Sequence, residues 1–169
     1  MLRLPEWLPW ASSGAYVIGA LLAAAIPGQG WPAVSASTRV ALGAAIIYCA
    51  AALFSADGSL AGAGAAPIVS ILIAFLGWVI GAYSRRYLRG EAGQSRFTIS
   101  FLATLAAVSA VAVSTNLSVL IVAWAASSAG LHHLLTFYRD RPAAIIVAHK
   151  KFLASRLAEG LLVIAAILL

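Results

Sequence analysis

The stretch from Phe97 to Tyr138 holds 42 residues without an Asp, Glu, Lys or Arg. A membrane-spanning helix needs about 20 apolar residues, because each residue adds about 1.5 Å and the hydrocarbon core is about 30 Å thick. One helix of this length would extend about 63 Å, twice that thickness. The stretch therefore predicts two spans, 97–113 and 117–138, separated by the polar turn formers Ser114–Asn116.

The composition of the whole chain agrees with a membrane protein. Of its 169 residues, 63% are hydrophobic and 9% are charged, whereas a soluble domain has about 25% charged residues. We expect an all-α, polytopic transmembrane helix bundle of about six spans, forming one integral membrane region over residues 1–169. The remaining spans are predicted at about 7–26, 37–56, 61–83 and 145–169.

The first predicted span, 7–26, could also be interpreted as a cleaved signal peptide. A signal peptide begins with a net positive region, but here Arg3 is offset by Glu6. We favour a retained helix. Inside the second span, the single cysteine, Cys49, is expected to be a small packed residue.

The net charge of +6 could indicate nucleic-acid binding, but the positions of the charges argue against it. Nine of the eleven Lys and Arg residues flank apolar spans, as in cytoplasmic loops under the positive-inside rule. Two predicted spans separate the basic loops 84–96 and 139–150, so both loops lie on one side. We predict a bacterial inner-membrane protein with its N-terminus outside. The predicted cytoplasmic anchors are Arg85, Arg86, Arg89, Arg139, Arg141 and Lys151.

The sixth span contains charges that a lipid-facing helix would not tolerate. Arg156 and Glu159 lie one turn apart on one helix face, and a charge at the bilayer centre costs about 2.5–3.5 kcal/mol on insertion scales. One interpretation is that the basic residues are interfacial anchors and Glu159 pairs with Arg156. The other places Glu159 and Lys150 in a buried line of titratable groups that moves protons. We favour the anchor role for Lys151 and the proton path for Glu159 and Lys150.

His132 and His133 are further candidates for this path, because histidine titrates near neutral pH. Adjacent residues on a helix point about 100° apart, so at most one of the two is expected to line a shared channel. The sequence shows no nucleophile, metal-ligand set or cofactor loop, so we expect no bound cofactor and no enzyme activity of this chain by itself.

The ordered segments "YSRRYLRG", "STNLSVLIVAW", "FYRDRPAA" and "HKKFLASRLAEG" resemble the antiporter-like membrane subunits of respiratory complex I. The large distal subunit, of the NADH dehydrogenase subunit 5/L type, is the most similar. The resemblance covers about 75–169. It places Lys150, Phe152, Arg156 and Glu159 on the family's Lys, Phe, Arg and Asp, but Ala125 stands where the family has a glutamate. That departure puts the ordinary complex I proton path in doubt.

One branch is more similar still: the DabB-type membrane subunit of the two-component, energy-coupled inorganic-carbon transporter. The resemblance rests on "SRRYL", on "LHHLLTFYRDRP" and on "KKFLASR". It implies a subunit that conducts cations, such as protons, to drive a large soluble, zinc-binding, carbonic-anhydrase-like partner. The zinc would be bound by that partner.

Two alternatives stay open. The chain could be a proton-translocating subunit of an NADH-quinone oxidoreductase, with sister respiratory subunits as partners, or a non-conducting fragment or membrane scaffold. Members of the resembled family have a dozen or more helices. We therefore expect this chain, truncated relative to the family, to be the N-terminal part of a longer protein.

Overall fold

The computed structural model describes residues 5–26, 28–55, 64–91, 93–137 and 142–168. Over these residues the chain forms six long helices and no strand, as predicted from the composition. A short 3-10 helix, η1 (Leu8–Trp10), leads into the first of them. The long helices are α1 (Ala11–Ala25), α2 (Gly30–Ser55), α4 (Ala66–Tyr87), α5 (Gln94–Val113), α6 (Leu117–Leu135) and α7 (Pro142–Leu168).

The long uncharged stretch is divided where the sequence predicted. Helix α5 ends at Val113 and α6 begins at Leu117. Asn116 caps α6: its side-chain oxygen accepts hydrogen bonds from the backbone N–H groups of Ser118 (2.9 Å) and Val119 (3.4 Å). Such a cap satisfies N–H groups that have no partner within the helix. The break therefore has a local chemical cause.

Other helix ends differ from the predicted spans. Helix α2 begins at Gly30, seven residues before the predicted start at 37. Pro32 lies in its first turn, where a proline is tolerated because the N–H that it lacks would have no helical partner. Helix α4 begins at Ala66, with Pro67 in its first turn, and continues to Tyr87. The predicted loop residues Arg85 and Arg86 therefore belong to its last turn, where basic side chains interact favourably with the helix dipole.

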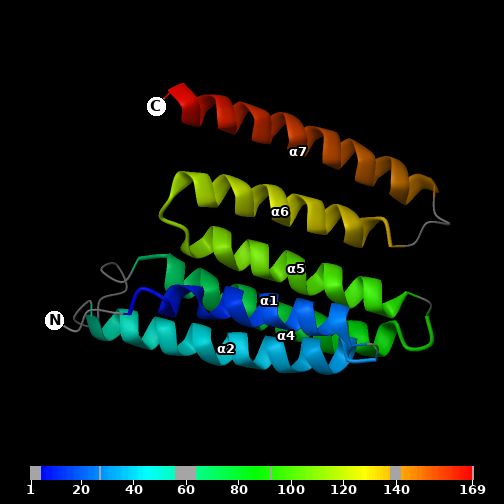
Figure 1. Cartoon of the computed structure of the whole chain (residues 1–169), viewed down its shortest axis with the longest axis horizontal. Helices are drawn as coiled ribbons and strands as arrows, with labels where there is room; N and C mark the ends of the chain where they lie inside the picture. Colours follow the sequence, from blue (N-terminus) through cyan, green and yellow to red (C-terminus); the bar gives the residue numbers. More distant parts are fainter. Residues whose placement is uncertain (1–4, 27, 56–63, 92, 138–141, 169) are drawn as a thin grey trace.

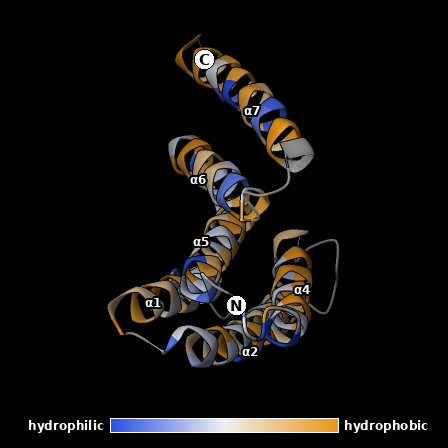
Figure 2. Cartoon of the chain, turned by 90° about the vertical axis from the view of Figure 1, so that its right-hand side faces the viewer, coloured by the Kyte–Doolittle hydropathy of each residue, from blue (hydrophilic) through white to orange (hydrophobic). Residues whose placement is uncertain are grey.

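Five helical segments are long and apolar enough to cross a membrane: 8–25, which joins η1 to α1, and helices α2, α4, α5 and α6. Helix α7 has 27 residues, but every 18-residue window of it contains at least three of its four charged residues. The hydropathy colours show apolar residues on every helix, mixed with paler ones, and hydrophilic segments on α7 (Figure 2). Many large apolar side chains are exposed on these helices, as expected for surfaces that face lipid. The chain is a multi-pass membrane protein.

The helices form a four-helix group and an extension. Helices α1, α2, α4 and α5 pack together, α6 packs on α5, and α7 packs on α6 (Figures 1 and 2). The core of the group contains Tyr16, Val34, Phe101 and Leu102, all at most 5% exposed. The site described below lies in the extension, between α6 and α7.

Small residues let the helices approach closely. A Cβ atom added to Gly19 of α1 would lie 2.9 Å from the Cβ atom of Ser37 in α2, and one on Gly81 of α4 would lie 3.0 Å from Val34. Between α5 and α6, Gly130 packs directly against Thr104. Close backbone approach at small residues is a main source of helix association in membranes, where apolar burial gives little driving force.

We expect Gly19→Val to destabilise the protein by about 1–3 kcal/mol, the usual cost of overpacking. Gly14→Val is the matched control, because Gly14 lies in the same helix with no atom within 4 Å of an added Cβ. Both substitutions change the intrinsic helix propensity by the same amount, so it cancels in the comparison. The measurement is the unfolding midpoint of the purified variants in detergent. Equal shifts for the two variants would contradict close packing at Gly19.

Candidate functional site

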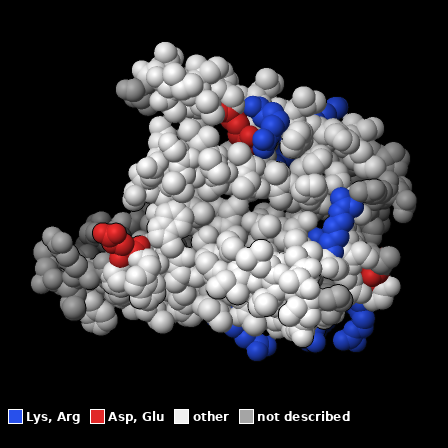
Figure 3. Space-filling view, in the orientation of Figure 1, with Lys and Arg blue, Asp and Glu red and all other residues white. Residues whose placement is uncertain are grey.

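An ion pair lies within the seam between α6 and α7. Arg156 Nη2 is 2.8 Å from one Glu159 carboxylate oxygen and donates a hydrogen bond of 2.9 Å to the other. The Glu159 side chain is 8% exposed, whereas that of Arg156 is 40% exposed. In Figure 3 an acidic patch lies directly against a basic patch where α6 and α7 pack. The buried carboxylate therefore has a charged partner on its own helix.

Arg156 also connects the two helices. The same Nη2 atom donates a hydrogen bond of 3.2 Å to the backbone carbonyl of Ala125 in α6. Ala125 is the residue that the sequence resemblance aligned with a glutamate of the complex I subunits. The arginine thus contacts a backbone carbonyl of α6, and Glu159 on its own helix neutralises its charge.

A cavity of about 260 Å³ lies among α5, α6 and α7, with Lys151 in its lining and neither member of the ion pair. Lys151 reaches across to α6, where Nζ donates to the Ser128 carbonyl oxygen (3.3 Å) and to Ser128 Oγ (3.2 Å). The other polar residues of the lining are Thr104, Ser127 and Ser155.

Lys150, in contrast to Lys151, is exposed. The structure therefore brings Lys151 into the seam and leaves Lys150 outside it, whereas the sequence placed Lys150 in the path and made Lys151 an anchor.

An aromatic chain continues the seam toward the start of α7. The His132 ring is half-buried and lies 4.7 Å from the Phe152 ring and 5.5 Å from the His149 ring, measured between centroids. The Arg156 guanidinium carbon is 5.0 Å from the Phe152 centroid, within the range of a cation–π contact. His133 is exposed. Of the two histidines, His132 therefore faces the seam and His133 does not.

The sequence analysis did not single out His149, Ser128 or Ser155. A signal for His149 was present, because positions 149, 152, 156 and 159 repeat at spacings of three and four and therefore share one face of a helix. Nothing in the sequence marked Ser128, whose partner Lys151 lies 23 residues away.

The predicted anchors fall into two groups. Arg85, Arg86 and Arg89 are exposed at the C-terminal end of α4, and Arg139 and Arg141 lie outside the described residues. The basic surface gathers in the half of the molecule away from the N-terminus (Figure 3), and the α4–α5 connection lies at that end (Figure 1). Within the described parts of the chain, no three His, Cys, Asp or Glu side chains are grouped so that they could hold a metal ion.

The comparisons with known proteins point to membrane subunits of transporters. The chain is 40% identical over 102 residues to the probable inorganic carbon transporter subunit DabB2 of Halothiobacillus neapolitanus, covering 60% of this chain and 18% of that protein. It is 38% identical over 99 residues to the probable inorganic carbon transporter subunit DabB of Hydrogenovibrio crunogenus, covering 58% and 19%.

The chain thus matches less than a fifth of the length of either curated relative. No protein-family profile matches the chain. No solved structure matches it either.

We expect Arg156 and Glu159 to be energetically coupled. Arg156→Gln leaves a buried carboxylate without its charged partner, so it should destabilise more than Lys150→Gln, which removes an exposed charge. A double-mutant cycle with Glu159→Gln should give a coupling of about 0.5–3 kcal/mol, toward the low end because the Arg156 side chain is 40% exposed. The measurement is the unfolding free energy of the four variants; additive effects would show that the two side chains are independent.

Proposed function

We propose that this chain contributes to a cation-conducting membrane subunit of an energy-coupled inorganic-carbon uptake complex, with protons as the cation. The observation that carries the proposal is the buried Glu159 carboxylate, held by Arg156 in a seam that also contains Lys151 and a cavity with serine and threonine side chains in its lining. Ionisable side chains within membrane helices are rare and mark ion or proton pathways. The printed names of the two relatives supply the carbon-transport part.

The proposed role of the pair follows from its two acceptors. In the ionised state, Glu159 holds the guanidinium of Arg156 through both carboxylate oxygens. Protonation of Glu159 removes this attraction, and Arg156 keeps the Ala125 carbonyl as an acceptor. A proton can thus bind to Glu159 and leave it while the Arg156 guanidinium keeps a hydrogen-bond acceptor.

Lys151 and the cavity would connect this carboxylate to water. The cavity of about 260 Å³ has room for several water molecules, since one occupies about 30 Å³ in the liquid. Its serine and threonine hydroxyls can both donate and accept hydrogen bonds. The half-buried His132 lies farther along the seam, and its Nδ1 is buried with no hydrogen-bond partner among the described residues. It is the second titratable group that we assign to the path.

The partner in this proposal is a large soluble, zinc-binding, carbonic-anhydrase-like subunit, which would carry the metal. The subunit would lie in a bacterial inner membrane with its N-terminus outside. In a quinone-reducing complex, the genes beside this one would instead encode sister redox subunits. The identity of the neighbouring genes therefore discriminates between the two functions.

We expect Glu159→Gln to abolish bicarbonate-dependent growth and proton uptake when the chain is expressed together with the products of its own locus. Glu159→Asp should retain part of the activity, because the carboxylate persists, and Lys150→Gln should retain nearly all of it. The amount of inserted protein must be equal in all three variants, as measured by membrane immunoblot. Full activity of Glu159→Gln would refute the role of this carboxylate.

The topology gives a separate prediction. In a Cys49→Ala background, a cysteine at Glu91 between α4 and α5 should react with a membrane-impermeant maleimide only after the cytoplasmic side is exposed. A cysteine at Thr115 between α5 and α6 should react in intact cells whose outer membrane is permeabilised. Both positions are exposed. The reverse labelling pattern would place the N-terminus inside.

A further inference from the structure

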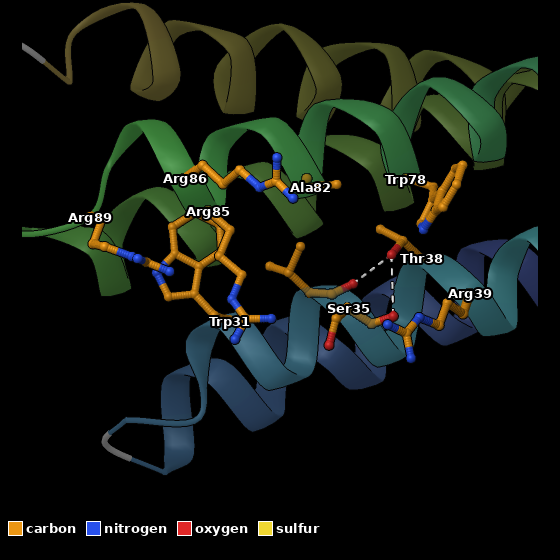
Figure 4. Close-up of a pocket in the computed structure, with 11 residues that line it drawn as sticks. Trp31, Ser35, Thr38, Arg39, Trp78, Ala82, Arg85, Arg86 and Arg89 are labelled. Atoms are coloured by element: carbon orange, nitrogen blue, oxygen red, sulfur yellow. Dashed lines mark hydrogen bonds between the residues drawn. The ribbon is translucent and has the colours of Figure 1, made fainter.

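A second polar pocket lies between α2 and α4, away from the α6–α7 seam. Its volume is about 240 Å³. Four arginines and two tryptophans are the main features of its lining (Figure 4): Arg39, Arg85, Arg86, Arg89, Trp31 and Trp78. None of these residues belongs to the proposed ion path, so that path does not account for the arginines of this pocket.

The pocket concentrates positive charge, and no acidic residue of the described part of the chain lines it. Among the described residues, none of the four arginines forms an ion pair or a side-chain hydrogen bond. Glu91, two residues after Arg89, does not line the pocket. Arg39 is the most informative of the four, because it lies nine residues inside the apolar helix α2. Charged residues inside membrane helices occur where they face a partner, a cavity or water, and Arg39 faces this pocket.

Three of the other polar side chains of the lining, those of Ser35, Thr38 and Trp31, already donate hydrogen bonds within the protein. Ser35 Oγ donates to the Pro32 carbonyl (2.9 Å), and Thr38 Oγ1 donates to the Val34 carbonyl (2.8 Å). The Trp31 indole N–H donates to Gln94 Oε1 at 2.6 Å. The free donors are therefore mainly guanidinium groups, which bind phosphate through paired hydrogen bonds. A volume of about 240 Å³ is below the about 300–1,000 Å³ of pockets that enclose a whole small molecule, and it suits a single phosphate group.

The position of the pocket identifies the source of that phosphate. It lies near the C-terminal end of α4, and Trp78 is 41% exposed on the apolar outer surface. Tryptophan is enriched at the level of the lipid headgroups, and basic pockets between membrane helices bind the headgroups of anionic lipids. We propose that the pocket between α2 and α4 binds the phosphate of an anionic phospholipid whose acyl chains lie along the outer surface of these helices.

The test compares two variants that lose the same charge. Arg39→Gln with Arg85→Gln removes two pocket arginines, one from each helix. Arg96→Gln with Lys150→Gln removes two exposed charges that do not line the pocket. Native mass spectrometry of the delipidated protein in detergent then measures binding of dioleoyl phosphatidylglycerol, with dioleoyl phosphatidylcholine and inorganic phosphate as the other probes.

We expect the pocket variant to bind phosphatidylglycerol at least tenfold more weakly than the native protein, and the control variant to stay within twofold. Equal losses in both variants, or equal binding of phosphatidylcholine by the native protein, would overturn the proposal. Displacement of the lipid by an equimolar amount of inorganic phosphate would instead indicate a site for a soluble anion and would also overturn it. All four substituted side chains are exposed, so unfolding midpoints without lipid should match the native value.

A second variant keeps the test decisive if the first fails to fold. Arg39→Lys with Arg85→Lys preserves the charge and removes the planar, paired donors. We expect it to lower the affinity for phosphatidylglycerol severalfold. Unchanged affinity would show that the guanidinium groups do not recognise the phosphate.

Discussion

The constraint on which this structure depends is that lipid offers no hydrogen bonds to the chain. Every backbone N–H and C=O group in the hydrocarbon region must find a partner within the protein, which favours helices. The hydroxyl side chains follow the same rule. Those of Ser37, Thr38, Ser70 and Thr104 donate to carbonyls one turn earlier in their own helices. A helix that satisfies its own polar groups can present apolar residues all round and pack through small ones.

A few polar groups bond across helices instead, and these mark where the helices are joined. In the four-helix group, Ser12 donates to the Ala41 carbonyl of α2, and Ser13 donates to the Ala106 carbonyl of α5. In the extension, the corresponding bonds come from the cations Lys151 and Arg156 of α7 to backbone carbonyls of α6. The extension is therefore joined by charged side chains, whereas the four-helix group is joined by neutral ones.

The two charged regions differ in their counter-charges. In the α6–α7 seam, Glu159 neutralises Arg156 within the protein, and we assign this region to cation movement. In the pocket between α2 and α4, the described residues supply no such carboxylate. Because no described carboxylate balances these arginines, we assign that region to the phosphate of an anionic lipid.

The sequence by itself determined that the protein is helical and lies in a membrane. Composition, the 42-residue uncharged stretch and the cap formed by Asn116 are local properties, so they could be predicted without the fold. The sequence also placed Arg156 and Glu159 on one helix face, because that relation depends only on helix geometry. Tertiary structure decided which lysine enters the seam, that Arg156 meets Ala125, and that Arg39 shares a pocket with the arginines of α4. These contacts depend on how each helix is rotated against its neighbour, and a helix that is apolar on all sides gives no periodic signal of that rotation.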